Sequence, residues 1–189
     1  EAIAVNEYML KLDPVNATGM ASLGSLYLYV GRTDEAFDLF QTLLKTNPGR
    51  PGGRYFLGVT QFFRGNTEAA LASFVEETDE EYRLHGKSLA LYALGRQAEF
   101  NSTFMQLQEK WGDRWPVDVA SVYAFSGDAD AAFLWLEKEL QVNGLSGQTT
   151  NNPFLSSLHE DPRWLPMLEK AGASTTQLDA IEFKLKLPE

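Results

Sequence analysis

The feature that most constrains the fold is a set of residues that recur every 34 positions in the first half of the chain. Gly31 and Gly65 are 34 residues apart, and several other pairs share this interval. The other pairs are Pro14 and Pro48, Leu23-Gly24 and Leu57-Gly58, Ala36 and Ala70, and Phe40 and Phe74. Self-similarity at a fixed period of this length is typical of a repeat architecture, in which each unit packs on its neighbours.

The repeated residues predict two helices in each unit. Gly31 and Gly65 predict a left-handed turn that ends the first helix, and Thr33 and Thr67 are expected to cap the second. Asn47-Pro48 is expected to end that second helix, because proline cannot continue it.

Small and large residues within the unit predict how its helices pack. Gly24 and Gly58 lack a Cβ atom and would let two antiparallel helices approach closely. Phe40 and Phe74 are expected to fill the space between successive hairpins.

This pattern resembles the tetratricopeptide repeat (TPR), a helix–turn–helix unit of 34 residues. The matching residues in the first unit are Leu23, Gly24, Tyr27, Ala36, Phe40 and Pro48, and in the second unit Leu57, Gly58, Ala70 and Phe74. The chain departs from the family pattern at Met20 and Arg54, where tryptophan is preferred, and at Gln61, where tyrosine is preferred. The resemblance implies an all-α, right-handed superhelix (solenoid) of TPR helix hairpins, with a C-terminal cap of short helices.

The expected organisation is a TPR array over residues 1–142 followed by a C-terminal region over 143–189. After Gly65 the period drifts, because the next similar turns lie at Gly95 and Gly127. The array divides into 1–16, 17–50, 51–79, 80–111 and 112–142. The first segment matches only the second helix of a repeat, so the chain is expected to be a fragment of a longer protein.

The C-terminal region is expected to contain a polar loop, short helices and an extended tail. Asn152-Pro153 and Asp161-Pro162 each favour a helix start, and Ser174 or Thr175 would cap a last short helix. Ile181, Phe183, Leu185 and Leu187 alternate with polar residues, which is typical of a strand.

A second, more specific resemblance covers roughly residues 80–187. Its motifs are the segment from Asp128 to Glu137, Asn152-Pro153-Phe154 and Asp161-Pro162-Arg163-Trp164. They are similar to the C-terminal TPR region of bacterial multidomain signalling proteins, in which the repeats follow a class III nucleotide cyclase, a winged-helix DNA-binding domain or a protein kinase domain. The resemblance implies signal transduction in such a protein, although none of the catalytic motifs of those domains is present.

Charge and composition argue against several classes of function. The chain has 16 Lys and Arg against 26 Asp and Glu, a formal net charge of −10. Nucleic acid and anionic membrane are therefore not expected as direct partners. The acidic run from Glu76 to Glu81 is interpreted as a solvated helix junction, with a docking patch for a basic partner as the alternative. The absence of cysteine fits both cytoplasm and periplasm.

No catalytic, metal or cofactor site is expected. There is no cysteine and only two histidines, and no spacing brings metal ligands together. His85 is interpreted as a polar contact or core residue on the first helix of its hairpin, and His159-Glu160-Asp161 as the entrance to a helix. The four tryptophans, Trp111, Trp115, Trp135 and Trp164, are expected in the core.

The predicted functional surface is the concave groove, which in this family is built from the first helix of each hairpin. Helical periodicity projects seven residues into it: Tyr55, Val59, Phe62, Tyr82, His85, Leu89 and Tyr92. Such an apolar, aromatic lining favours an extended or helical apolar segment of a protein or peptide partner.

The main hypothesis is a non-catalytic protein–protein interaction scaffold, and three alternatives stay open. The protein's own C-terminal segment could fill the groove. The chain could form a homodimer through its N-terminal helix, which carries Ile3, Val5, Met9 and Leu12, or through its C-terminal tail. A pocket between repeats and cap could serve a small-molecule sensor, and a closed cavity lined by His85 and arginines would favour this.

Overall fold

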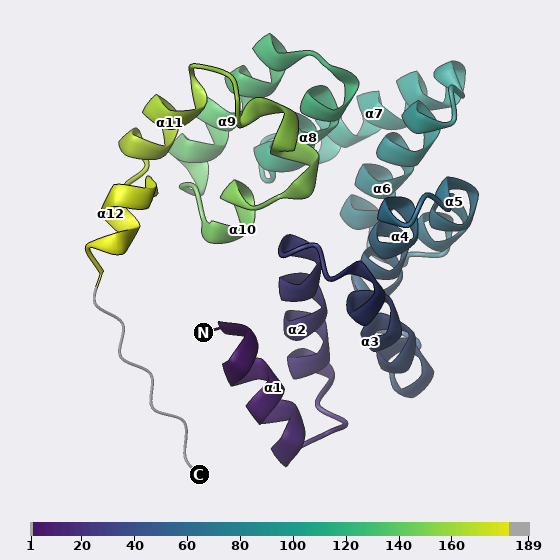
Figure 1. The fold of residues 1–189 in the computed structure, drawn as a ribbon. Helices are drawn as coiled ribbons and strands as arrows, with labels where there is room; N and C mark the ends of the chain where they lie inside the picture. Colours follow the sequence, from purple (N-terminus) through teal and green to yellow (C-terminus); the bar gives the residue numbers. More distant parts are fainter. Residues whose placement is uncertain (1, 182–189) are drawn as a thin grey trace. The chain divides into compact units, whose positions relative to one another are not determined.

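The computed structural model describes residues 2–181, which are built from helices and connecting turns without a strand (Figure 1). The predicted all-α fold of helix hairpins is confirmed. The described residues divide into two compact units, residues 2–100 and residues 101–181. The alternating residues Phe183, Leu185 and Leu187, for which the sequence predicted a strand, lie outside the described residues.

The first unit is a run of helices, and among the first six of them each neighbouring pair along the chain is in contact. Its helices are α1 (Ala2–Leu12), α2 (Ala17–Tyr29), α3 (Thr33–Thr46), α4 (Gly53–Phe63), α5 (Thr67–Val75), α6 (Glu80–Ala93) and the start of α7 (Gln97–Trp111). The helices α2 and α3 form one hairpin, and α4 and α5 form the next.

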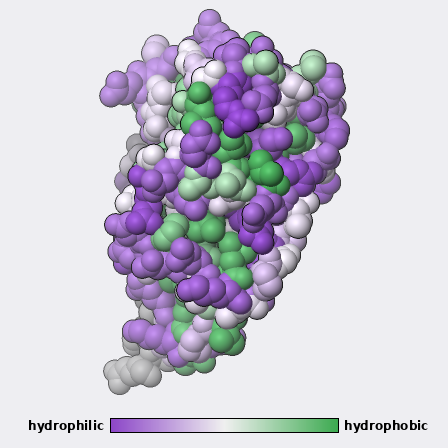
Figure 2. All heavy atoms as spheres, turned by 90° about the vertical axis from the view of Figure 1, so that its right-hand side faces the viewer, coloured by the Kyte–Doolittle hydropathy of each residue, from purple (hydrophilic) through white to green (hydrophobic). Residues whose placement is uncertain are grey.

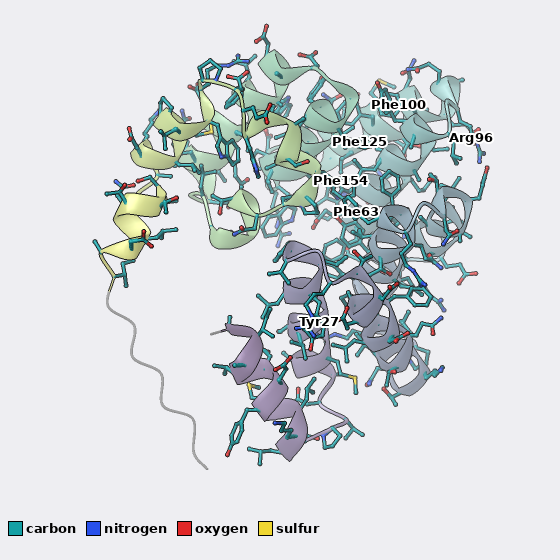
Figure 3. All side chains as sticks on the ribbon, viewed as in Figure 1. Tyr27, Phe63, Arg96, Phe100, Phe125 and Phe154 are labelled. Atoms are coloured by element: carbon teal, nitrogen blue, oxygen red, sulfur yellow. The ribbon has the colours of Figure 1, made fainter. Side chains whose placement is uncertain are left out.

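The second unit contains the rest of α7, one further hairpin and several short helices. They are α8 (Pro116–Ser126), α9 (Ala129–Val142), α10 (Gly147–Thr150), the 3-10 helix η1 (Pro153–Leu158), α11 (Trp164–Lys170) and α12 (Thr175–Asp179). The helix α8 contacts both α9 and η1. Figure 3 shows Phe125 of α8 and Phe154 of η1, whose ring centres lie 5.9 Å apart. Trp164 is buried with this core, whereas the other three tryptophans are only half-buried.

The glycines of the repeat act as predicted. Gly31 and Gly65 have φ values of 78° and 80°, the left-handed conformation that glycine adopts at least cost. A Cβ atom added to Gly24 would lie 2.6 Å from Cζ of Phe40, and one added to Gly58 would lie 2.5 Å from Cε1 of Phe74. Glycine is therefore required at both positions because the phenylalanine ring of the same hairpin packs directly against it.

The prediction that Thr33 and Thr67 cap the second helices is wrong. The helices α3 and α5 begin at these residues, and the preceding Arg32 and Asn66 make no side-chain cap hydrogen bond. Because the glycine turn leads directly into the helix, each threonine occupies the first helical position, where the backbone is no longer extended. Thr33 instead donates its hydroxyl to the carbonyl oxygen of Gly31, 3.4 Å away.

Of the helix starts predicted in the C-terminal region, the one after Asn152 and the one capped by Ser174 are confirmed. Asn152 accepts a hydrogen bond from the backbone N–H of Phe154 at 3.0 Å, and Ser174 forms a capping box with Gln177. Asp161 is not the cap of α11, which begins two residues further on than predicted, after Arg163. Its carboxylate accepts from the backbone N–H of Arg163 at 2.9 Å, so it stabilises the turn before the helix.

Candidate functional site

Three of the predicted groove residues meet in one aromatic cluster between α4 and α6. The rings of Tyr55 and Tyr82 are stacked with centres 4.8 Å apart. The hydroxyl of Tyr55 lies 2.9 Å from Nδ1 of His85, within hydrogen-bonding distance. The ring of Phe56 also contacts this cluster, 5.1 Å from that of Tyr55. The first helices of two successive hairpins are therefore joined by aromatic packing and a buried polar contact.

Most of the predicted groove residues present little surface to a partner. Tyr55, Val59, His85 and Leu89 are all buried. Burial lowers the pKa of His85 to about 3, because the charged imidazolium is poorly solvated there. The imidazole is consequently neutral near neutral pH, and it serves as a core residue in contact with Tyr55.

The other three predicted groove residues, Phe62, Tyr82 and Tyr92, are half-buried. Phe62 packs edge-on against Phe63 at the end of α4, with ring centres 5.8 Å apart, and Phe63 is 42% exposed (Figure 3). Tyr92 packs against Phe100 at 5.3 Å. Aromatic surface is thus available along α4 and α6 only where the rings reach out of the core.

The acidic run contains a structural residue that the sequence interpretation missed. Glu77 is 3% exposed, and its two carboxylate oxygens accept from the backbone N–H groups of Tyr55 and Asp79, each at 3.0 Å. Tyr55 lies in the first turn of α4, where backbone N–H groups have no helical partner. The interpretation of the whole run as solvated is therefore wrong at Glu77, which caps the first helix of its hairpin.

In the other unit, a second buried carboxylate also caps the first helix of its hairpin. Glu139 is 4% exposed, and its Oε2 accepts from the backbone N–H of Val117 at 3.2 Å and from Nδ2 of Asn143 at 3.0 Å. Burial raises the pKa of Glu139, partly offset by these two hydrogen bonds. The acceptor lies 22 residues after the donor in both hairpins. This common spacing is the sequence signal that would have identified both caps.

The second unit also contains a pocket of about 330 Å³ between α9 and the segment from Pro162 to Lys170. Its lining residues are Phe133, Glu137, Leu140, Pro162, Arg163, Pro166, Met167 and Lys170. The pocket lies between the last hairpin and the short helices, as the small-molecule hypothesis requires. Its lining includes an arginine but does not include His85.

Several charged side chains elsewhere form ion pairs at the surface. Arg54 forms an ion pair with Glu76 at 2.9 Å, and Arg64 forms one with Asp34 at 3.1 Å. On the side of the molecule that Figure 2 shows, apolar residues form separate patches bordered by hydrophilic residues. A partner meeting that side would find local apolar contacts rather than one broad apolar face.

Within residues 2–181, no three or more Asp, Glu or His side chains are arranged to hold a metal ion. No helix in the described part of the chain is long and apolar enough to cross a membrane.

A tandem series of helix hairpins, each with a left-handed glycine turn and a small residue against a large one, defines the architecture. The comparisons with solved structures assign it to the TPR fold. The chain is 23% identical to TTC0263, a thermophilic TPR protein in Thermus thermophilus, with a TM-score of 0.54 over 86% of this chain and 90% of that one. MamA is 18% identical, with a TM-score of 0.52 over 74% of this chain and 85% of that one. YrrB is 22% identical over 75% of this chain and 76% of that one, with a TM-score of 0.47.

No family model matches the chain, and no curated protein does. The structural likeness therefore concerns the fold.

Proposed function

We propose that the chain is a non-catalytic protein-interaction scaffold that binds an apolar segment of a partner along α4 and α6. The TPR fold supports this, because hairpin arrays present extended surfaces formed by successive helices. The observation that supports the position is that Phe62, Tyr82 and Tyr92 remain half-buried. Partly exposed aromatic rings offer a large contact area at small entropic cost.

The buried members of the predicted set act as support in this proposal. Tyr55 and His85 hold α4 against α6 through their 2.9 Å contact, and Tyr82 stacks on Tyr55. Replacing Tyr55 would therefore disturb the fold together with any binding surface, so a test needs residues at the edge of the cluster.

The test uses peptides selected from a phage-displayed library on the intact chain, followed by affinity measurements on variants. Phe62→Ala is expected to weaken the selected peptide about tenfold or more, the loss of one aromatic anchor. Val75→Ala is the matched control, because Val75 is 55% exposed on the second helix α5. Unchanged affinity of a folded Phe62→Ala variant, or an equal loss in the control, would contradict the proposal.

A second candidate function, self-association, is favoured by the exposure of α1. This helix has no buried residue, and Met9 and Leu12 are 42% and 71% exposed. A homodimer would cover this apolar surface with the same helix of a second copy. Sedimentation velocity at rising concentration should then show a dimer that Leu12→Asn weakens, and a monomer at every concentration would eliminate this candidate.

We further propose that the scaffold belongs to a larger bacterial signalling protein. The support is the resemblance carried by Asp128–Glu137, Asn152-Pro153-Phe154 and Asp161-Pro162-Arg163-Trp164. Sequencing of the complete gene product tests this, since a cyclase, winged-helix or kinase domain is expected and a protein with no such domain would contradict it.

A further inference from the structure

The pocket between α9 and α11 has an apolar interior formed by side chains from both sides. Phe133 and Leu140 line it from α9, and Met167 lines it from α11. Phe133 and Met167 also belong to the buried core of the second unit. Because the core holds these two side chains in place, the pocket is formed before any ligand arrives. Its volume of about 330 Å³ lies at the lower end of the range for small-molecule sites.

Arg163 forms a fixed part of the pocket lining. Its Nη1 donates to Asp130 at 2.7 Å, and its Nε and Nη2 donate to the two oxygens of Asp161 at 2.9 and 2.8 Å. The guanidinium also lies over the ring of Phe133, 4.3 Å from its centre. All three nitrogens of the guanidinium thus donate to two carboxylates that offset its charge, so Arg163 is not the group that would receive an anionic ligand.

Two other charged groups of the lining have no such partner. Glu137 comes from α9 and Lys170 from α11, and neither forms an ion pair with another described residue. A ligand with only a carboxylate would be attracted by Lys170 but repelled by Glu137, and a ligand with only an ammonium group would be attracted by Glu137 but repelled by Lys170. The charge pattern therefore selects a ligand that carries both charges.

We propose that this pocket binds a small zwitterion with a bulky apolar group, which is the chemistry of a free apolar α-amino acid. The apolar group would enter between Phe133, Leu140 and Met167, with the ammonium group toward Glu137 and the carboxylate toward Lys170. This inference goes beyond the proposed scaffold function, and it concerns a different unit of the chain from α4 and α6.

The experiment titrates four related probes into the intact chain and follows the methyl NMR signals of Met167 and Leu140. The probes are L-phenylalanine, 3-phenylpropionate without the ammonium group, 2-phenylethylamine without the carboxylate, and uncharged N-acetyl-L-phenylalaninamide. L-phenylalanine is expected to give a saturable shift with a Kd of about 1 mM or tighter. The other three probes should bind more weakly.

Variants locate the charges and the pocket. Glu137→Gln and Lys170→Gln should each weaken L-phenylalanine about two- to fivefold, as expected for exposed ion pairs. Glu169→Gln, a neighbouring residue on α11 outside the lining, should leave the affinity unchanged. Leu140→Trp should fill the pocket and abolish the shift at Met167.

Three results would overturn the proposal. The first is the absence of a saturable shift with L-phenylalanine. The second is equal binding of N-acetyl-L-phenylalaninamide, which would identify the pocket as a socket for a side chain of a polypeptide. The third is binding that persists in a folded Leu140→Trp variant, which would place the site elsewhere.

Discussion

The hairpin α4–α5 and the hairpin α8–α9 reach the same packing with different pairs of side chains. Seven residues before the turn glycine, the first has Gly58 and the second has Ala120; nine residues after it, the first has Phe74 and the second has Leu136. Phe74 and Leu136 are fully buried, and Ala120 and Leu136 belong to one buried cluster. Ala120 is larger than Gly58 by a methyl group, and Leu136 is smaller than Phe74. The summed volume of the pair is therefore conserved between the two hairpins, although the residues differ.

The two hairpins also share a carboxylate cap but surround it differently. Glu77 uses both oxygens, one for Tyr55 and one for Asp79. Glu139 accepts from both Val117 and Asn143 through Oε2. The two hairpins therefore share the spacing between the capping carboxylate and the capped N–H group, whereas the other donors around each carboxylate differ.

The largest expected effect breaks the packing of the first hairpin. Gly58→Ala places a Cβ atom 2.5 Å from Phe74, which forces the ring or α4 to move and should cost about 3 kcal/mol of stability. Gly49→Ala is the control, because a Cβ atom there meets nothing within 4 Å. Chemical denaturation of both variants measures the difference, and equal stabilities would refute the tight contact.

Acid should act in opposite directions on His85 in the first unit and on Glu139 in the second. The folded-state pKa of His85 is about 3, so the unfolded chain binds a proton below about pH 6.5 that the folded chain does not. Stability is therefore lost as pH falls from about 6.5 towards 3, by about 2 kcal/mol at pH 5. Measuring unfolding free energies at pH 7 and pH 5 for the wild type and His85→Asn should show a smaller loss in the variant. Equal losses would mean that His85 is protonated in the folded state.

Glu139 has the opposite sign, because burial raises its folded-state pKa. Its contribution to stability is fully present below its unfolded pKa and is lost as pH rises through the folded value. In an NMR titration, the carboxyl carbon of Glu139 should therefore change at a higher pH than that of an exposed glutamate. A midpoint at or below the ordinary value would contradict the burial of its charge.

Removing the negative charge of each capping glutamate should affect the stability of the two hairpins differently. Glu77→Gln replaces one of the two accepting oxygens by an amide NH2 group, which is a donor facing another N–H donor. The substitution should cost about 1–2 kcal/mol of stability. Stability measured by urea denaturation at pH 7 tests this, with Glu76→Gln as an exposed neighbour for comparison. A loss no greater than that of the neighbour would show that the cap is unimportant.

The smallest effect is expected for Glu139→Gln. The amide oxygen can replace Oε2 for both donors, and the substitution removes a charge that burial disfavours, so stability at pH 7 should stay within about 0.5 kcal/mol or increase. A loss as large as that of Glu77→Gln would mean that both caps require a negative charge.

The sequence predicted the parts of the fold that depend on short-range chemistry. Gly31 and Gly65 have no Cβ atom and identify left-handed turns without reference to the rest of the chain. Gly58 and Phe74 were found through their repeat spacing. The prediction at Thr33 was wrong because the glycine turn leads directly into α3. Thr33 is therefore the first helical residue, and Arg32 occupies the cap position.

The candidate sites were less predictable because they depend on contacts between distant residues. The prediction placed Tyr55 and His85 on the correct helices. Their hydrogen-bond contact was not predicted, because it joins residues that are 30 positions apart in the sequence. Glu77 looked solvated because its neighbours are acidic, and only the position of Tyr55 in space shows why it is buried. The pocket near Met167 requires the packing of α11 on α9, for which the sequence has no periodic signal.

A double-mutant cycle at Gly58 and Phe74 tests most directly whether the hairpins are volume-conserving variants of one packing. The Gly58→Ala, Phe74→Leu double variant introduces into the first hairpin the pair found at Ala120 and Leu136. If the two hairpins share one volume-conserving packing, the double variant loses at least about 1 kcal/mol less stability than the two single variants lose together. Additive losses would show that the two side chains are independent and that the hairpins do not share one volume-conserving packing.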